Sequence, residues 1–411
     1  MDSRGLVTFA ILVLVVTAGC SGLGDETDAP TLTPAPVPDA DVHEQVVTPS
    51  VPTESVATFT PENPSATGPL GLRDQRSVRT ALWRLRTVLD VGAIEPTVVR
   101  QFGLSRPVDA GSLGTSDAVT GSLGPTVDTG GVPPGRVDSE NATVRLLRGM
   151  YEPSRLEYHL AYLHTRFLQD RLGWADALAR HDNGTLDRRL VATALDRGAS
   201  AYAADAYAAQ YSLSVDTPVR EWQFGWLDSP WLARAAVRAG YDYAGGQITA
   251  PDSLGQLYTE PPNTTEQLLH GLPPGSEPPQ PLEVTLVGTG DWNRVATEQF
   301  GELGIRALLS TRIDGDEADR AARGWGNDRL LAFEDGTTSG VVWVTTWDQP
   351  SYAEQFLAGY QQYAAAGNPP QTSALTRPGS KAVVVTAGSS AFVEGVTVAG
   401  DNESVSVSLS E

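Results

Sequence analysis

A stretch near the start of this chain limits what the chain can fold into, because the stretch has almost nothing to bury. Residues 21–70 contain nine prolines and eight threonines, and no lysine or arginine. This composition cannot bury enough apolar surface to offset the entropy of ordering the backbone, so we expect an extended, disordered tether. The folded body is therefore expected within residues 71–411, which is long enough for one large core or two modest ones.

The segment before the tether has the features of an export signal. An apolar run from Gly5 to Ala18 follows Arg4, and it is short for a membrane span but typical in length of a signal peptide. It leads to Cys20, the only cysteine, in the sequence TAGC, which resembles a lipobox. We predict that residues 1–20 are a lipoprotein signal peptide and that a lipid on Cys20 holds the protein on the extracellular face of the cell membrane. The alternative is an uncleaved signal anchor.

The charge of the chain indicates the medium in which it works. Asp and Glu number 50 against 29 Lys and Arg, the formal net charge is −21, and Lys381 is the only lysine. Abundant carboxylates and scarce lysine suit a protein that stays soluble in concentrated salt. An acidic protein from a low-salt organism would match the charge but not the near absence of lysine. Nucleic acid is not an expected partner, because its phosphates would be repelled.

Four sequons suit an exported chain. They begin at Asn141, Asn183, Asn263 and Asn402, and we predict these as candidate glycosylation sites.

Hydrophobic periodicity predicts an α+β protein. Apolar residues at helical spacing predict helices at residues 76–90, 155–172, 187–210 and 230–239, and residues 103–140, rich in Gly, Ser, Pro and Asp, predict one long surface loop. Beyond residue 281 we expect strands at 282–287, 330–333, 341–346 and 382–386, with helices near 292–309, 316–323 and 350–365. The body should thus divide into a helical part, residues 71–280, and a mixed α/β part, residues 281–411.

Four segments together resemble a known family. Residues 155–173 read RLEYHLAYLHTRFLQDRLG and residues 193–200 read TALDRGAS, while residues 257–271 read LYTEPPNTTEQLLHG and residues 324–329 read GWGNDR. They resemble, in this order, the H-E-x-x-H-A-L-Q-D-Q helix, the L-V-E-G-D-A segment, the Y-x-x-P-P-x-S-T-E-Q-x-L-H-P segment and the G-W-G-G-D-R segment of a haloarchaeal surface-protein family related to gluzincin zinc metallopeptidases. The resemblance implies a zincin-like helical core.

The same resemblance implies that the metal site is lost. In an active member two histidines and a glutamate on the next helix bind zinc, and the glutamate between the histidines is the general base. Aligned on Leu168-Gln169-Asp170, the histidine positions fall on Tyr162 and Arg166, the general base on Leu163 and the third ligand on Arg197. We therefore expect no catalytic residue, no metal and no other cofactor.

Two arginines in place of a metal need counter-charges. If the alignment is right, Arg166 and Arg197 project from neighbouring helices, and each must reach a carboxylate or solvent. Candidate partners are Asp170, Asp196 and Asp205. An ion-pair brace is the preferred interpretation, and an anion site is the weaker one.

Other suggestive residues have ordinary explanations. His159 and His164 are five residues apart, about 140° around a helix, so they cannot share a metal, and we expect them to face solvent or to be hydrogen-bonded. Glu266 and His270 are spaced for a surface ion pair on a short helix that Thr264 or Thr265 begins. The residues Asp314, Asp316 and Asp319 lack the spacing of a calcium loop and suit helix capping, and residues 288–290 suit a tight turn.

The preferred hypothesis is a catalytically inactive, lipid-anchored surface protein on a metallopeptidase-like scaffold. Apart from the membrane, its partner would be an envelope protein or peptide. One alternative is a zinc peptidase with a displaced metal site. Another is an unrelated solute-binding lipoprotein with two doubly wound lobes, which the long helical first half argues against.

Overall fold

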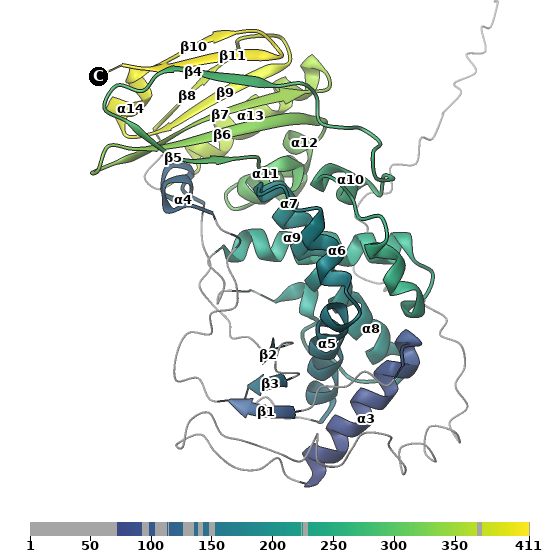
Figure 1. Ribbon diagram of the computed structural model, residues 1–411. Coiled ribbons are helices and arrows are strands. Elements are labelled where there is room, and N and C mark those ends of the chain that lie inside the picture. Colours follow the sequence, from purple (N-terminus) through teal and green to yellow (C-terminus); the bar gives the residue numbers. More distant parts are fainter. Residues whose placement is uncertain are drawn as a thin grey trace, which may run out of the picture.

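A computed structural model describes residues 72–92, 98–102, 113, 115–125, 135–138, 143–147, 153–222, 224, 229–367 and 372–410. Helices dominate its first part and sheets its second, as Figure 1 shows, which confirms the α+β prediction. Residues 1–71, which include the predicted signal peptide, Cys20 and the tether, lie outside the described residues.

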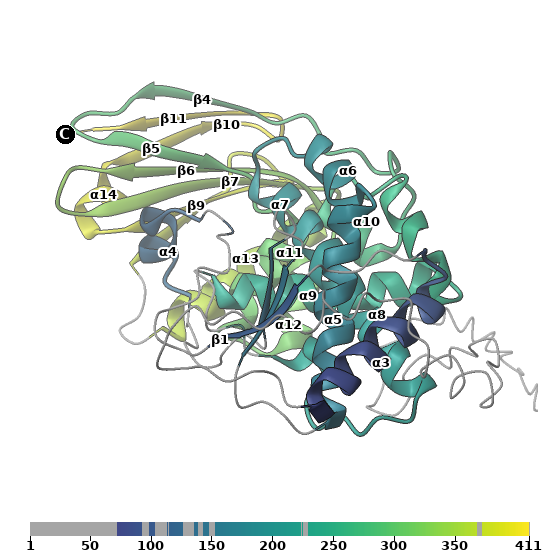
Figure 2. The same ribbon diagram turned by 60° about the horizontal axis from the view of Figure 1, so that its bottom comes forward.

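The helical part is built around one long helix, α5 (Pro153–Arg171). Its predicted apolar stripe is buried and includes Leu160 and Phe167. Figure 2 shows α3 (Leu72–Leu89) and α8 (Ala199–Gln210) beside it, and both pack against it. The remaining helical elements are α6 (Trp174–Arg180), α7 (Leu186–Thr193), the π-helical turn η2 (Ala194–Gly198), η3 (Val219–Glu221), α9 (Pro230–Gln247), η4 (Pro251–Tyr258) and α10 (Thr265–His270).

The predicted helix over residues 187–210 is confirmed, with a π-helical turn in its middle. The chain runs without a break through α7, η2 and α8. α9 crosses η2 at a very close approach, because Gly198 and Gly240 face each other: a Cβ on Gly240 would lie 1.9 Å from the carbonyl oxygen of Ala194. Only a residue without a side chain fits there.

The prediction of one long surface loop over residues 103–140 is wrong. Within it, α4 (Asp117–Leu123) begins at the N-cap Ser116, buries Val119 and Leu123, and packs on strand β7 of the C-terminal part. Strand β2 (Gly135–Asp138) lies at its end and pairs antiparallel with β3 (Thr143–Leu147), which pairs parallel with β1 (Val98–Phe102). A helix of only seven residues, with Ala118, Val119 and Leu123 as its apolar positions, is too short to show a period.

The C-terminal part has three layers. A five-stranded sheet has the order β5-β6-β7-β9-β8, and a three-stranded sheet has the order β10-β11-β4. Apolar residues such as Phe333, Val342 and Val407 form a core between the two sheets, whereas Trp343 and Val385 face the helices on the other side. The strands are β4 (Glu283–Gly288), β5 (Asn293–Glu298), β6 (Trp325–Glu334), β7 (Ser339–Trp347), β8 (Ser373–Thr376), β9 (Ala382–Gly388), β10 (Val396–Gly400) and β11 (Ser404–Leu409), and the helices are α11 (Gly301–Ser310), α12 (Gly315–Ala322), α13 (Pro350–Ala365) and α14 (Ser390–Gly395).

The sequence-based prediction of a helix over residues 292–309 is wrong in its first half. Residues 293–298 form the edge strand β5, and α11 begins only at Gly301. Gly301 has φ +69°, and a Cβ there would lie 1.7 Å from Oδ1 of Asp187, so this glycine allows the chain to turn from strand to helix. The other strands and helices predicted beyond residue 281 are present.

Candidate functional site

The four positions of the expected metal site lie where α5 meets η2. Tyr162, Leu163 and Arg166 are on α5, and Arg197 is on η2. Tyr162 is 3% exposed, and its ring packs edge-on against Trp222. Leu163, at the position where the resemblance would place the general base, is fully buried against strand β2 and belongs to the core.

A single carboxylate lies between the two arginines. Arg166 donates two hydrogen bonds to Asp196, from Nε to Oδ1 at 3.2 Å and from Nη2 to Oδ2 at 2.9 Å. Nε of Arg197 lies 3.8 Å from the same Oδ2. The side chain of Arg166 is 23% exposed, that of Asp196 31% and that of Arg197 13%. The structure thus brings both predicted arginines to one of the three predicted acids.

Asp196 acts mainly on Arg166. Burial alone would lower the pKa of the Arg166 guanidinium, but the charge and hydrogen bonds of Asp196, together with Tyr162 and Asp170, outweigh burial and raise it. The pKa of Arg197 is lowered, by burial first and then by the neighbouring Arg166. Burial raises the pKa of the Tyr162 phenol, and the two arginines oppose that rise. The cluster therefore has one strong, bidentate ion pair and a second arginine at a longer distance.

Asp205 was predicted as a candidate partner of the two arginines, but it pairs with other residues. It accepts a hydrogen bond from Tyr158 at 2.6 Å and pairs with Arg220. Tyr158 lies on α5, which packs against α8, and Arg220 lies on η3, which packs against α9; Asp205 is thus engaged by these two residues and not by Arg166 or Arg197.

These residues do not fit a zinc ion. Zinc takes imidazole, thiolate or carboxylate ligands, and here it would meet two guanidinium groups, a phenol and an aliphatic side chain. Asp196, the carboxylate beside both arginines, already binds Arg166 through both oxygens. Over the described part of the chain, no group of three or more His, Cys, Asp and Glu side chains is arranged to hold a metal ion.

The π-helical turn is fastened by residues from two other segments. A π turn leaves backbone carbonyls without their usual partners. Gln169 on α5 donates to the carbonyl oxygens of Asp196 at 2.9 Å and Leu195 at 3.3 Å, and Tyr258 donates to Leu195 at 2.9 Å. Gln169 also donates to Tyr258 at 2.6 Å. Three of the four segments that carry the family resemblance therefore meet at one point.

The remaining motif residues join the helical and C-terminal parts. Thr265 donates through its backbone N–H and its hydroxyl to Oδ1 of Asp187, at 3.0 and 2.5 Å, and accepts from the backbone of Leu303 at 3.1 Å. Figure 1 shows α7, α10 and α11 together at this junction. The segment at residues 257–271 thus docks on the helices of this junction.

Asp328, from the GWGNDR segment, anchors the start of α11. Its fully buried carboxylate accepts four hydrogen bonds of 2.9–3.0 Å, from the backbone of Phe300 and Gly301 and from the indoles of Trp325 and Trp343. A buried charge with four donors is well satisfied.

The two histidines of α5 are buried, so the prediction that they face solvent is wrong. His159 is 6% exposed and packs against Trp222, and burial lowers its pKa to about 4. His164 is fully buried and stacks on Phe167, and burial lowers its pKa to about 3. Neither ring nitrogen of His164 has a hydrogen-bond partner among the described residues, so the prediction that it is hydrogen-bonded also fails.

The predicted pair of Glu266 with His270 is also wrong. α10 begins as expected after the N-cap Thr264, but Nε2 of His270 lies 3.0 Å from both carboxylate oxygens of Glu302 on α11. Glu266 is only 5% exposed, and its pKa is raised to about 9, by burial first and then by Glu302 and Asp348. Glu302 lies 32 residues from His270, which no short-range pattern could indicate.

The Asp314 prediction is confirmed: its side chain caps α12 by accepting from the backbone of Asp316. The predicted turn follows β4 one residue later than expected, at residues 289–292, where the backbone N–H of Trp292 donates to Thr289 at 2.9 Å and Gly290 has φ +53°.

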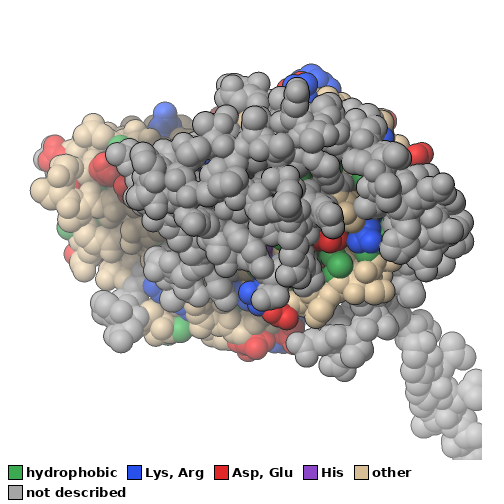
Figure 3. Space-filling model, turned by 90° about the horizontal axis from the view of Figure 1, so that it is seen from below, with side chains coloured by type: hydrophobic (Ala, Val, Ile, Leu, Met, Phe, Trp, Pro, Cys, Tyr) green, Lys and Arg blue, Asp and Glu red, His purple; other side chains and the backbone are tan. Residues whose placement is uncertain are grey.

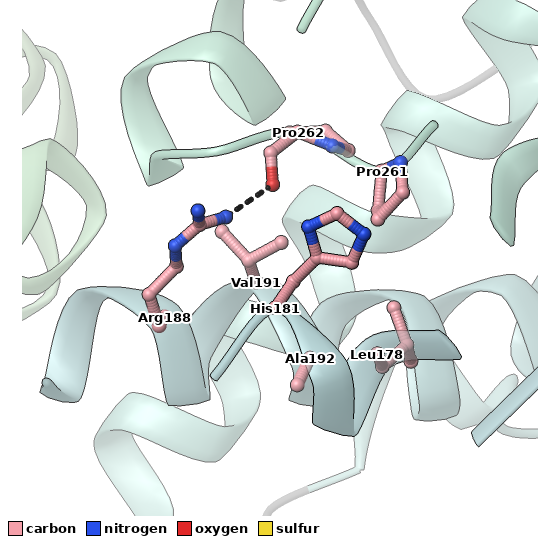
Figure 4. A pocket seen from close by; sticks show the side chains of 7 residues that line it. All are labelled: Leu178, His181, Arg188, Val191, Ala192, Pro261 and Pro262. Atoms are coloured by element: carbon pink, nitrogen blue, oxygen red, sulfur yellow. Dashed lines mark hydrogen bonds between the residues drawn. The ribbon is translucent and has the colours of Figure 1, made fainter. Parts of the chain in front are cut away.

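Figure 4 shows a shallow pocket between α6, α7 and residues 261–262. Arg188 closes one side by donating to the carbonyl of Pro262 at 3.0 Å, and His181 lies across from it. The volume of about 10 Å³ holds about one water molecule, so this pocket is too small for a substrate. Where the described surface is visible in Figure 3, acidic and basic side chains are interspersed.

A family model described as a domain of unknown function (DUF8575) matches residues 287–409. This match covers the C-terminal part and none of the helices from α3 to α10. No curated protein and no solved structure matched the chain. Among the described residues, no helix is both long enough and apolar enough to cross a membrane.

Proposed function

We propose that this chain is an exported protein, lipid-anchored at Cys20 on the extracellular face of the membrane, with a binding or structural role at the cell envelope. Its body is proposed to be a metallopeptidase-like scaffold that no longer catalyses hydrolysis. The observation that carries this proposal is the bidentate pair of Arg166 with Asp196, with Arg197 at 3.8 Å. The two arginines stand at positions that the alignment with the resembled family assigns to zinc ligands.

The physical argument rests on the kind of group at each position. A zinc peptidase needs a cation to polarise a carbonyl and a base to activate water. Two fixed guanidinium groups repel a divalent cation, and Leu163 offers no base. What the cluster can do is hold α5 against η2, since Arg166 on α5 forms a bidentate pair with Asp196 on η2.

The convergence of Gln169, Leu195 and Tyr258 supports the scaffold part of the proposal. Residues far apart in sequence meet there although the zinc ligands are absent, as expected if the surroundings of an ancestral site were retained for stability. The partner is proposed to be an envelope protein or peptide and not a nucleic acid, since the chain has a net charge of −21.

Metal analysis and peptidase assays on the purified full chain test this proposal. We expect less than one equivalent of zinc after equilibration with zinc, no chelator effect on thermal stability, and no hydrolysis of peptide libraries. A matched control is the variant carrying Tyr162→His, Leu163→Glu, Arg166→His and Arg197→Glu, which places the family's ligands on the same backbone and should gain zinc-dependent stability. Stoichiometric zinc and zinc-dependent hydrolysis by the unaltered chain would instead establish a peptidase with a displaced metal site.

A further inference from the structure

The three sequons within the described residues lie in three different settings. Asn183 is in the exposed loop of residues 181–184 between α6 and α7, whereas Asn263 and Asn402 are half-buried. A transferase that modifies a sequon must reach both the asparagine and the hydroxyl two residues later. Accessibility of these two groups therefore distinguishes the sites.

At Asn183 the reactive atom is held outward. Its Oδ1 accepts hydrogen bonds from the backbone N–H of Thr185 at 3.1 Å and from the Thr185 hydroxyl at 2.7 Å. Because an N–H can only donate, this geometry fixes which end of the amide is oxygen, and it leaves Nδ2 on the solvent side. No described residue accepts a hydrogen bond from this Nδ2. Gly184, at φ +79°, produces the turn that presents it.

The same contact places the hydroxyl beside the asparagine. Thr185 is the N-cap of α7 and is held at a defined place on the surface, where it also accepts from the backbone of Arg188 at 3.4 Å. Both groups that define the sequon are therefore adjacent and reachable from solvent.

At Asn263 the second group is out of reach. Thr265, two residues on, is fully buried, and its hydroxyl is engaged by Asp187 and Leu303. The Asn263 side chain is itself held by Arg188 at 2.8 Å. Modification there would require the junction of α10 with α7 to open.

At Asn402 the side chain packs against the loop that contains Gly379 and Lys381. Its Oδ1 accepts from the backbone of Lys381 at 2.7 Å, and a Cβ on Gly379 would lie 2.3 Å from that oxygen. Asp401 closes the turn by accepting from the backbone of Glu403 and Ser404, each at 2.9 Å. The half-buried amide therefore lies along a neighbouring loop, which leaves it less accessible to a transferase than the exposed Asn183.

We propose that Asn183 carries an N-linked glycan and that Asn263 and Asn402 do not; this rests on the proposed export. The donor is a glycan joined through phosphate to a polyprenol lipid. Nδ2 forms a bond to the anomeric carbon of the first sugar, and the bond between that carbon and the phosphate oxygen breaks, with its electron pair remaining on the lipid phosphate. Nδ2 loses one proton to solvent, and nothing is oxidised or reduced.

The test is peptide mass spectrometry on the full chain purified from membranes of a haloarchaeal host. We expect the peptide with Asn183 to carry glycan mass and the peptides with Asn263 and Asn402 to be unmodified. Asn183→Gln should remove the mass of one glycan from the intact protein, whereas Asn402→Gln should leave the attached glycan mass unchanged. Thr185→Ser keeps both the hydroxyl and the helix cap, so it should keep the glycan, and Thr185→Ala should lose it.

The outcomes separate this inference from the proposed function. An unmodified Asn183 on a chain whose N-terminus is cleaved and lipid-modified would overturn the glycan inference alone. Glycan on Asn263 or Asn402 in place of Asn183 would overturn it as well. An unmodified Asn183 on a chain with an unprocessed N-terminus, retained inside the cell, would overturn both.

Discussion

Replacing Asp196 with asparagine tests whether the ion pairs between α5 and η2 stabilise the fold. Asparagine keeps the size of the side chain and removes its charge. Arg166 would lose one of its two hydrogen bonds, at 2.9 or 3.2 Å, and the charge attraction of both. Arg166 and Arg197 would then face each other without a carboxylate between them.

The exposure of the pair decides the size of the effect. Exposed ion pairs contribute at most about 1 kcal/mol, and breaking a fully buried pair costs about 3–5 kcal/mol. Arg166 and Asp196 are 23% and 31% exposed, between these limits. We expect Asp196→Asn to lower the free energy of unfolding by about 2 kcal/mol, a roughly thirtyfold change in the unfolding equilibrium.

Urea unfolding in concentrated salt, followed by tryptophan fluorescence, measures this change. Asp176→Asn is the matched control, because Asp176 is an exposed acid on α6 and should change the free energy by less than about 0.5 kcal/mol. Adding Arg197→Met to Asp196→Asn should restore part of the loss by removing the repulsion between the arginines. If Asp196→Asn is no more destabilising than Asp176→Asn, the argument for an ion-pair brace is wrong.

Three further predictions follow from other residues. Cys20→Ser should leave a precursor that has no lipid and leaves the membrane fraction, and an unchanged mature mass would contradict the lipobox. Asp328→Asn should lower the free energy of unfolding by about 4 kcal/mol, because an amide NH₂ would face two of the four donors, and urea unfolding measures this. Burial raises the pKa of Asp187 to about 7, and burial with nearby acids raises that of Glu266 to about 9, so above about pH 4 the folded state binds more protons than the unfolded state. The free energy of unfolding should therefore fall as the pH rises from 4 to 9, and Asp187→Asn or Glu266→Gln should make that fall less steep. An unchanged slope in both variants would contradict this prediction.

The helices could be predicted from the sequence where their apolar period was long. The apolar stripe on α5 repeats over about five turns, and it predicted this helix correctly. The edge strand β5 was missed because most of its residues are exposed, so it has no buried face to alternate. The strand β11 reads Ser-Val-Ser-Val-Ser-Leu, and its strict alternation could have been recognised.

The residues of the candidate site could be predicted only where their contacts follow from spacing along a helical segment. Both arginines and Asp196 were identified, since their positions follow from two helical segments and one alignment. The pairing of Asp205 with Arg220, and of His270 with Glu302, depends on how distant elements pack. No short pattern in the sequence encodes these contacts. The sequence gives the charges, and the tertiary packing decides which ones meet.

The pairing of β4 with β11 determines where the C-terminal part can be cut. β4 covers one edge of β11 in parallel, and its inward residues Val284 and Leu286 pack on the core between the sheets. A recombinant fragment that starts at residue 287, where the family match begins, would lack the first four of the six residues of β4, including Val284 and Leu286. It would leave the edge of β11 open to pairing with other chains, so such a fragment should aggregate. A soluble fragment must therefore start before residue 283. The residues that the family model matches are in this case fewer than the residues that the C-terminal part needs to fold.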